Sequence, residues 1–332
     1  MLQRTALFAA MSFFVLVAGC ASAPGAAYLH VPPAARTQVA STEVVMPIKQ
    51  SEIYMIVPSS QAVAMQFGMV GALVGAGVDA SIAKAADTAL QPVRASLADF
   101  SFDSVLQADL KSALAQEAWM HPADYTVVKE VSPQKLDDVI TNSKSSAVLL
   151  VTADYQLSKD GDELTVTISP CLYPVAAELK AMLPGGALKS GPKTRVDNAL
   201  YCNTLAYHDV VVGAVGDRDA NIALWSANNG AAMRSSLQKA STHLTGMMIA
   251  GLESPPAPPA DPSKSGLPKK SVELVPGYAV PGYVVRTDEG GSYLAFVGGR
   301  EMYFTTSAMT YQRSTKHKQT AVEREREQRK SK

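Results

Sequence analysis

The chain has 332 residues, of which 47% are hydrophobic and 18% are charged. This composition is sufficient for a hydrophobic core and excludes an intrinsically disordered protein. Basic and acidic side chains balance at 30 each, so no basic face is expected and nucleic acid is not an expected partner. A chain of this length is typical of about two domains.

Residues 1–19 predict a signal peptide, because Arg4 precedes an apolar run at residues 6–18 that is too short to span a membrane. The run leads into a cysteine preceded by small residues, namely Val17, Ala18, Gly19 and Cys20. This pattern resembles the bacterial lipobox, which implies cleavage before Cys20 and attachment of diacylglycerol to its thiol. An ordinary signal peptide with a chance cysteine is the alternative.

The residue after Cys20 is Ala21, not the aspartate that retains lipoproteins in the inner membrane of enteric bacteria. The resemblance therefore implies an outer-membrane lipoprotein, anchored to the membrane by its lipid on the periplasmic side. Two or three acyl chains make a durable anchor, since each buried methylene contributes roughly 0.8 kcal/mol. Residues 20–44, rich in Ala and Pro, predict a lipidated tether.

Residues 45–253 predict an α/β domain, an α+β sandwich in which helices cover a mixed sheet. Strands are expected at residues 52–58, 125–128, 147–157, 164–171 and 199–213. Helices are expected at residues 79–97, 102–119 and 133–140, with a long final helix that ends at Leu252. Local signals support these elements: Ser101 and Ser132 as helix caps, Asp160-Gly161 as a hairpin turn, and Asn228-Asn229-Gly230 before the final helix.

The C-terminal part begins with a Pro-rich segment, residues 254–271, which predicts a semi-rigid linker. Residues 272–311 predict a small β module, with strands at 277–285, 292–297 and 301–304. A module of this size is too small for an independent core, so it is expected to dock on the first domain or on a partner. Residues 312–332 predict a charged tail.

Two cysteines, Cys171 and Cys202, remain after Cys20 is lipidated. The periplasm is oxidising, so these two are expected to form a disulfide, which would stabilise the fold by roughly 3–4 kcal/mol. The alternative is a pair of buried free thiols. Two cysteines and five scattered histidines show no metal-ligand spacing, so neither a metal site nor a cofactor is expected.

A glycine-rich apolar run lies at residues 62–78 and contains Gly68, Gly71, Gly75 and Gly77. One interpretation is a segment that inserts into a membrane, as in a ring-forming channel. The run is shorter than the roughly 20 residues of a spanning helix. A closely packed helix or loop is the alternative.

Catalytic chemistry is not indicated by the sequence. The chain has no G-x-S-x-G and no H-E-x-x-H pattern. His208 and Asp209 are neighbours on an expected strand, so their side chains point to opposite faces and cannot act together. The segment that starts at Asp217 resembles the beginning of a calcium loop but has Ile222 and Asn228 where glycine and glutamate are needed, so a polar loop between strands is expected instead. We therefore expect no enzyme and no catalytic residue.

The C-terminal module is rich in aromatic residues, including Tyr278, Tyr283, Tyr293 and Tyr303. Exposed tyrosines could form a surface that binds a glycan or a peptide. The alternative is that these rings fill the core of a small β module.

Several segments resemble a group of uncharacterised proteobacterial lipoproteins. They are the glycine stretch leading into Val78-Asp79, Gln91-Pro92-Val93-Arg94, Leu97-Ala98-Asp99-Phe100, and Leu224-Trp225-Ser226 with Gly230 and the closing helix. The architecture expected over residues 45–252 also resembles the periplasmic domains of curli-secretion-channel and penicillin-binding-protein-activator lipoproteins. That resemblance implies a protein that binds other envelope proteins or self-associates, and that is not an enzyme.

The sequence thus predicts an outer-membrane lipoprotein that is a non-enzymatic scaffold, assembly factor or regulatory partner in a cell-envelope complex. Its partner would be another envelope protein or a second copy of the chain. The alternative is a lipoprotein that binds cell-wall glycan or a peptide through its aromatic C-terminal module.

Overall fold

The computed structural model describes residues 31–48, 50, 52–56, 80–129, 131–183, 186–253, 262–275, 278–296 and 300–311. Several predicted features lie outside these residues. They are the signal peptide with Val17, Ala18, Gly19 and Cys20, the glycines Gly68, Gly71, Gly75 and Gly77, and the tail at residues 312–332.

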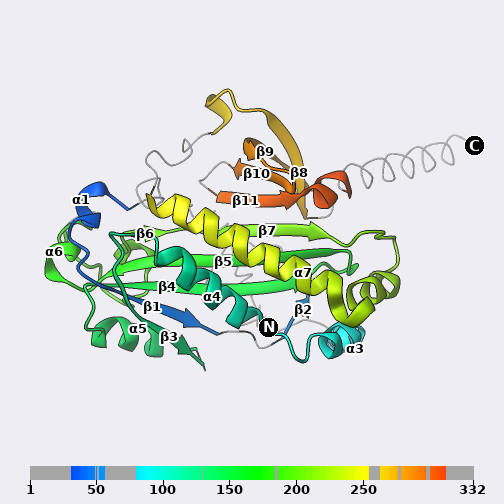
Figure 1. Ribbon diagram of the computed structural model, residues 1–332, viewed down its shortest axis with the longest axis horizontal. Coiled ribbons are helices and arrows are strands. Elements are labelled where there is room, and N and C mark those ends of the chain that lie inside the picture. The colour runs from blue at the N-terminus through cyan, green and yellow to red at the C-terminus, as the bar shows by residue number, and fades with distance from the viewer. Residues whose placement is uncertain are drawn as a thin grey trace, which may run out of the picture.

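The described residues form one mixed sheet with helices on it, so the predicted α/β class is confirmed (Figure 1). The sheet has eleven strands, nine of them in the order β3-β1-β4-β5-β7-β11-β10-β9-β8. The strands of its first half are β1 (Thr42–Pro47), β2 (Tyr54–Met55), β3 (Pro122–Val128), β4 (Ala147–Leu157), β5 (Glu163–Pro174), β6 (Tyr201–Cys202) and β7 (Leu205–Val210). Strand β1 is parallel to β3 and β4, whereas β5 is antiparallel to β4 and β7.

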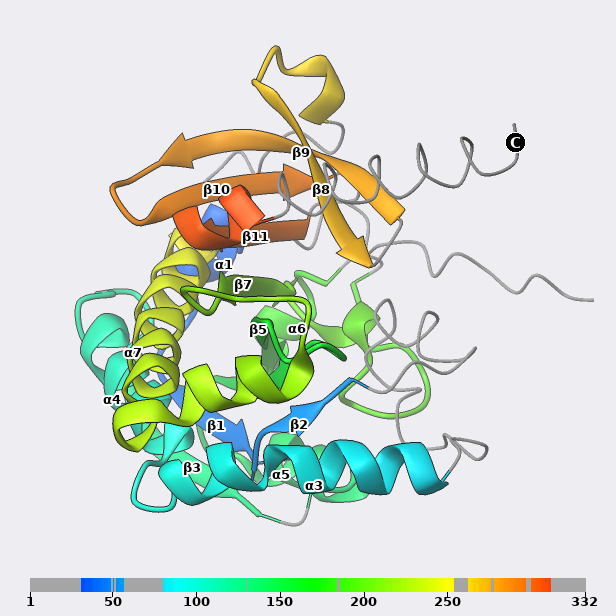
Figure 2. The same cartoon turned by 90° about the vertical axis from the view of Figure 1, so that its right-hand side faces the viewer.

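The C-terminal strands continue this sheet. They are β8 (Lys269–Val275), β9 (Tyr278–Thr287), β10 (Gly291–Phe296) and β11 (Arg300–Thr305). Strand β11 runs parallel to β7, with Tyr303 opposite Tyr207 and Phe304 opposite His208. Figure 2 shows the strong twist of this half, in which β8 lies steeply across the neighbouring strands. Strand β8 was not predicted, and it begins within the span that the sequence assigned to the linker.

Helices cover both faces of the sheet. The larger core lies between the sheet and α3 (Ala80–Ser96), α4 (Phe102–Leu114) and α7 (Arg218–Glu253). On the opposite face, α5 (Pro133–Asn142) covers a smaller core. Neighbouring residues in β4 show the alternation, because Val148 belongs to the α5 side and Leu149 to the α7 side. Short helices α1 (Pro33–Arg36), α6 (Ala177–Lys180), η3 (Val196–Asn198) and η4 (Pro262–Lys264) complete the fold.

The predicted helix caps are confirmed. The Ser101 hydroxyl accepts a hydrogen bond from the Ser104 backbone N–H at 3.2 Å and begins α4. The Ser132 hydroxyl accepts one from the Lys135 N–H at 3.1 Å, with Pro133 in the first turn of α5. Each cap satisfies a backbone donor that the helix itself leaves unpaired.

Helix α7 is interrupted where the sequence predicted a helix start. Residues Asn228, Asn229 and Gly230 have left-handed φ angles of 51°, 56° and 69° and separate two helical stretches. Only glycine fits at the third position, because a Cβ on Gly230 would lie 2.6 Å from the Ser96 Oγ. The stretch before the break is helical rather than a loop, and its Trp225 donates a hydrogen bond to the Gly161 carbonyl at 2.8 Å.

Two strand predictions and one turn prediction differ from the structure. The expected first core strand at residues 52–58 contributes only the two-residue β2, and the central strand is β1. The expected strand at residues 199–213 is divided into β6 and β7. In the turn between β4 and β5, the structure gives positive φ to Gly161 but not to Asp160. This turn is wider than a two-residue hairpin, since the Ser158 N–H donates to the Glu163 carbonyl.

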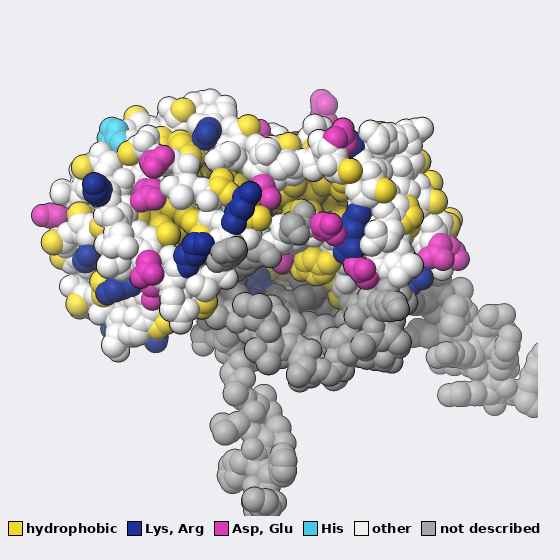
Figure 3. Space-filling model, turned by 90° about the horizontal axis from the view of Figure 1, so that it is seen from below, with side chains coloured by type: hydrophobic (Ala, Val, Ile, Leu, Met, Phe, Trp, Pro, Cys, Tyr) yellow, Lys and Arg dark blue, Asp and Glu magenta, His cyan; other side chains and the backbone are white. Residues whose placement is uncertain are grey.

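Strand β3 ends the sheet on one side, and among the described strands it pairs only with β1. Its Val127 side chain is 41% exposed. Figure 3 views the molecule from below and shows hydrophobic side chains in a hollow right of the centre, with acidic and basic side chains around it. Within the part of the chain that the structure describes, no helix combines the length and apolar character needed to cross a membrane.

Candidate functional site

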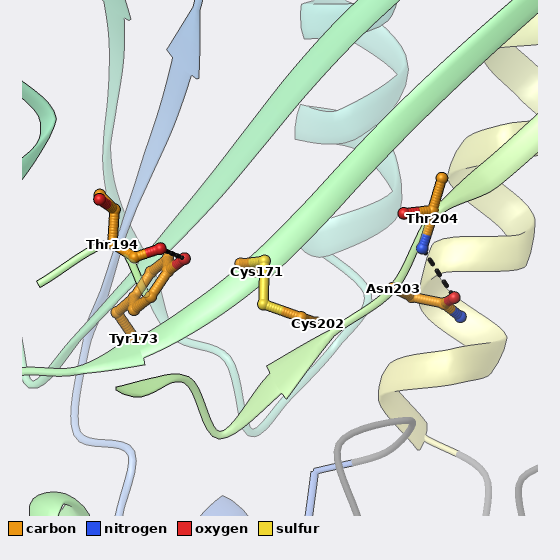
Figure 4. The surroundings of a disulfide bond; sticks show 6 residues. All are labelled: Cys171, Tyr173, Thr194, Cys202, Asn203 and Thr204. Atoms are coloured by element: carbon orange, nitrogen blue, oxygen red, sulfur yellow. Dashed lines mark hydrogen bonds between the residues drawn. A yellow bond between two sulfur atoms is a disulfide. The ribbon is translucent and has the colours of Figure 1, made fainter. Parts of the chain in front are cut away.

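The predicted disulfide between Cys171 and Cys202 is present (Figure 4). The two residues face each other on the antiparallel strands β5 and β6, and each is 3% exposed. Nearby, the Tyr173 hydroxyl donates to the Thr194 carbonyl at 2.8 Å. The disulfide therefore joins the connection that precedes β6 to the smaller core of the sheet.

A second group of side chains lies where the C-terminal strands meet α7, and we call it the junction cluster. It combines rings from three strands with a histidine from the helix and two charged groups. Its members are Tyr207 of β7, His243 of α7, Arg286 of β9, Asp288 of the following turn, Tyr293 of β10 and Tyr303 of β11.

The junction cluster is held by stacked rings and short hydrogen bonds. The His243 and Tyr303 rings stack with centroids 3.9 Å apart, and Tyr207 stacks on the Tyr303 ring at 5.6 Å. The His243 Nδ1 lies 2.8 Å from the Tyr293 hydroxyl, and the Tyr303 hydroxyl donates to the Asp288 Oδ1 at 2.8 Å. Parallel pairing of β11 with β7 places these rings next to α7.

The charge states of the junction cluster follow from burial. Loss of solvent lowers the pKa of His243 against the opposing effect of Asp288, and Arg286 and Lys239 lower it further. Burial and the bond to Asp288 raise the pKa of Tyr303. Partial desolvation of Asp288 acts to raise its pKa, but hydrogen bonds from Tyr303 and from the Gly290 and Gly291 N–H groups lower it overall. A neutral imidazole and protonated tyrosines thus surround a carboxylate that is already hydrogen-bonded.

The structure corrects the candidate ligand surface. Tyr303 is fully buried and Tyr283 is only 7% exposed, so both rings serve packing rather than a surface. They are buried because β10 and β11 lie against β9, β7 and α7 instead of facing solvent. Tyr293 is half-buried, and the Arg286 guanidinium covers one face of its ring at 3.8 Å. The side chain of Tyr278 lies outside the described residues.

His208 and Asp209 do point to opposite faces of β7. The His208 Nδ1 lies 2.6 Å from the Glu163 Oε1, and the His208 ring stacks on Phe304 at 4.5 Å. Asp209 accepts hydrogen bonds from three hydroxyls, those of Ser236, Thr305 and Ser307, at 2.7 to 2.9 Å. Asp209 therefore ties β7 to α7 and to the end of β11.

Sequence reasoning missed this role of Asp209, because the hydroxyl partners lie 27 to 98 residues further along the chain. No local spacing signals such a network.

The segment expected to be a polar loop starts a helix, since the Asp217 carboxylate accepts a hydrogen bond from the Ala220 N–H at 2.8 Å. The described residues include no group of three or more histidine, cysteine or acidic side chains that could hold a metal ion.

No protein-family model matches the chain, and no curated protein matches its sequence.

Proposed function

We propose that the chain is an outer-membrane lipoprotein on the periplasmic side that acts as a non-enzymatic scaffold, assembly factor or regulatory partner in an envelope complex. The observation that carries this proposal is the buried Cys171–Cys202 disulfide, because such bonds persist in oxidising compartments and are rare in the cytosol. The lipobox that ends at Cys20 supports the lipid anchor.

A binding role is supported by the β3 side of the sheet. The outer edge of a terminal strand can pair with an extended segment of a partner. Part of this edge is blunted, because the Asp124 carboxylate accepts a hydrogen bond from the Tyr125 N–H at 2.7 Å. The exposed Val127 lies two residues further on.

The anchor is tested by expressing the full chain in a Gram-negative host and measuring the mass of its N-terminal peptide. We expect the mature chain to begin at Cys20 and to carry acyl chains, with the protein in the outer-membrane fraction. The Cys20→Ala variant is expected to lose both the lipid and the membrane fraction. A wild-type chain cleaved elsewhere, or cleaved without acylation, would contradict the proposal.

The binding role is tested by placing a photo-crosslinking amino acid at position 127 of the full chain and irradiating intact cells. The matched control carries the same amino acid at Val212, which is 85% exposed in the turn that follows β7. We expect a discrete adduct from position 127 alone. An adduct of twice the chain mass identifies self-association, and another mass identifies an envelope protein. Equal labelling at both positions would refute a specific contact at β3.

The alternative function, binding of cell-wall glycan or peptide, retains one specific observation, which is the half-buried Tyr293 beneath Arg286. The Arg286→Ala variant uncovers this ring without removing a core side chain. A change in retention on purified cell wall would support the alternative. A deletion of residues 271–311 is no clean test, since it removes the strand that pairs with β7.

A further inference from the structure

The first described residues are fixed firmly to the rest of the fold. Val31 is fully buried and lies just before α1. Arg36 of α1 donates from its Nε to the Val31 carbonyl at 3.2 Å and from its Nη2 to the Glu253 carbonyl at 2.5 Å. Arg36 thus supplies a cation to the C-terminal end of α7, whose own last turn contains no basic residue. The fold therefore meets the preceding part of the chain at one defined place, beside the end of α7.

The connection between α6 and η3 lies at the same end of the molecule, and Ser146, just before β4, joins the two places. Its hydroxyl accepts hydrogen bonds from the Ala40 and Ser41 N–H groups, which follow α1, at 2.9 and 3.0 Å. Its carbonyl accepts from the Val175 and Ala176 N–H groups, which precede α6, at 2.8 and 2.9 Å. Figure 1 accordingly shows α1 and α6 at the same end of the sheet.

This connection carries unbalanced positive charge, although the chain as a whole is neutral. Residues 179–196 contain no acidic residue and four basic ones, namely Lys180, Lys189, Lys193 and Arg195. Of the two acidic residues that flank the stretch, Glu178 and Asp197, only Asp197 pairs with it, at 3.0 Å from Arg195. Within the part of the chain that the structure describes, the three lysine side chains form no hydrogen bond or ion pair. Three ammonium groups are therefore available to an external anion.

The loop that follows Lys189 is held in place from within the fold. Asn198 is fully buried, and its side chain accepts from the Lys189 N–H at 2.6 Å and donates to the Pro192 carbonyl at 3.2 Å. The Thr194 N–H and hydroxyl donate to the Asp137 Oδ1 of α5 at 3.0 and 3.1 Å. A loop that is already ordered loses little conformational entropy when it binds.

We propose that this connection is the membrane-facing surface of the folded part, and that Lys180, Lys189 and Lys193 bind the phosphates of anionic lipid headgroups. The direction rests on the proposed lipid anchor. Cys20 precedes Val31 by eleven residues, and a chain of that length spans at most about 40 Å when fully extended. The anchor therefore keeps the end of the molecule that contains Val31 next to the bilayer. A bilayer also presents many phosphates, so all three lysines are attracted to it at once.

Vesicle binding of the mature chain, residues 21–332, tests this surface. The chain is exported behind a cleavable signal peptide, so it forms its disulfide but carries no lipid, and the described fold is complete because it begins at residue 31. We expect co-sedimentation with vesicles that contain phosphatidylglycerol and not with vesicles of phosphatidylcholine alone. Binding should weaken as salt rises, since the Debye length falls from about 10 Å at 0.1 M salt to about 3 Å at 1 M. Equal binding to both kinds of vesicle, or binding to neither, would refute the surface.

The variant that combines Lys189→Gln with Lys193→Gln removes two of the three lysines. Each lysine near an anionic membrane surface strengthens binding about fivefold, so the partition coefficient should fall about 25-fold. The matched control combines Lys159→Gln with Lys239→Gln, which removes the same charge from exposed lysines in the β4–β5 turn and on α7. The control should bind as the wild type does, and equal losses in the two variants would exclude a specific surface at the α6–η3 connection.

The outcome can be separated from that of the lipid anchor, because the protein in this assay carries no lipid and the mass of the N-terminal peptide reports the acylation of Cys20. An acylated chain whose two variants lose binding equally would refute the surface and leave the anchor. A selective loss in the Lys189 and Lys193 variant, together with a chain that is not acylated, would refute the anchor while the surface still binds anionic lipid.

Discussion

The break in α7 offers a quantitative test, because a single methyl group at Gly230 meets two separate obstacles. Its φ of 69° lies in the left-handed region, which costs a side chain roughly 1–2 kcal/mol. The added Cβ would also lie 2.6 Å from the Ser96 Oγ. Ser96 is held in place, since its hydroxyl donates to the Val93 carbonyl at 2.7 Å and its own carbonyl accepts from Arg234 at 2.5 Å.

The magnitude follows from these two contributions. Overpacking at a site that cannot move costs about 1–3 kcal/mol. Replacing glycine by alanine also lowers the conformational entropy of the unfolded chain, which stabilises the folded state by about 0.4–1 kcal/mol. We therefore expect Gly230→Ala to lower the free energy of unfolding by about 2–4 kcal/mol. For a domain of this size, that corresponds to a Tm lower by roughly 5–15 °C.

The assay is guanidinium and thermal unfolding of a double-mutant cycle with Ser96→Gly, which removes the clash but not the backbone strain. In that background, Gly230→Ala should cost only about 1 kcal/mol. Gly246→Ala is the control in the same helix, since nothing lies within 4 Å of its added Cβ, and it should be neutral or stabilising. Additive effects of the two substitutions, or a destabilising Gly246→Ala, would refute the reasoning.

Three further predictions concern the disulfide, the β10–β11 pair and the junction cluster. Replacing Cys171 and Cys202 together by Ala removes a disulfide between residues 31 positions apart. The free energy of unfolding should fall by about 3.5 kcal/mol. Equal unfolding midpoints of the wild type with and without reductant would argue against this value. Gly291→Ala places a Cβ 2.1 Å from the Phe304 carbonyl oxygen, so β10 should detach from β11, and unchanged amide protection in β11 would count against that. The folded-state pKa of His243 lies below its ordinary value of 6.5. Between these two pKa values the unfolded state binds more protons than the folded state, so the free energy of unfolding should fall as the pH drops below 6.5. His243→Gln should flatten that fall, and an unaltered pH profile would exclude His243 as its source.

Local backbone physics made several elements predictable from the sequence alone. Ser101 and Ser132 were identified as caps because a hydroxyl just before a helix satisfies a free N–H whatever the rest of the fold does. Gly161 is predictable as a turn residue because few residues tolerate positive φ, and Asn228-Asn229-Gly230 predicts the start of the helical stretch that follows it. The disulfide required only two cysteines and an inferred oxidising compartment.

The central position of β1 could not be read from its own residues. The strand is six residues long and directly follows Ala/Pro-rich sequence, so composition placed part of it in the tether. Its place in the sheet is determined by parallel pairing with β3 and β4, which follow it by about 80 to 105 residues in the register. Parallel strands carry no signal of their partner, because the crossover between them can be long.

For the residues that the structure describes, the sequence by itself determined the α/β class and the places where several helices and turns begin. These features depend on hydrophobic periodicity and on local hydrogen bonds. Tertiary structure alone decided that β11 pairs with β7, that Asp209 collects three distant hydroxyls, and that Arg36 caps α7. Each of these contacts joins segments far apart in the chain. Such contacts form only when the whole core brings the segments together, so no sequence window contains them.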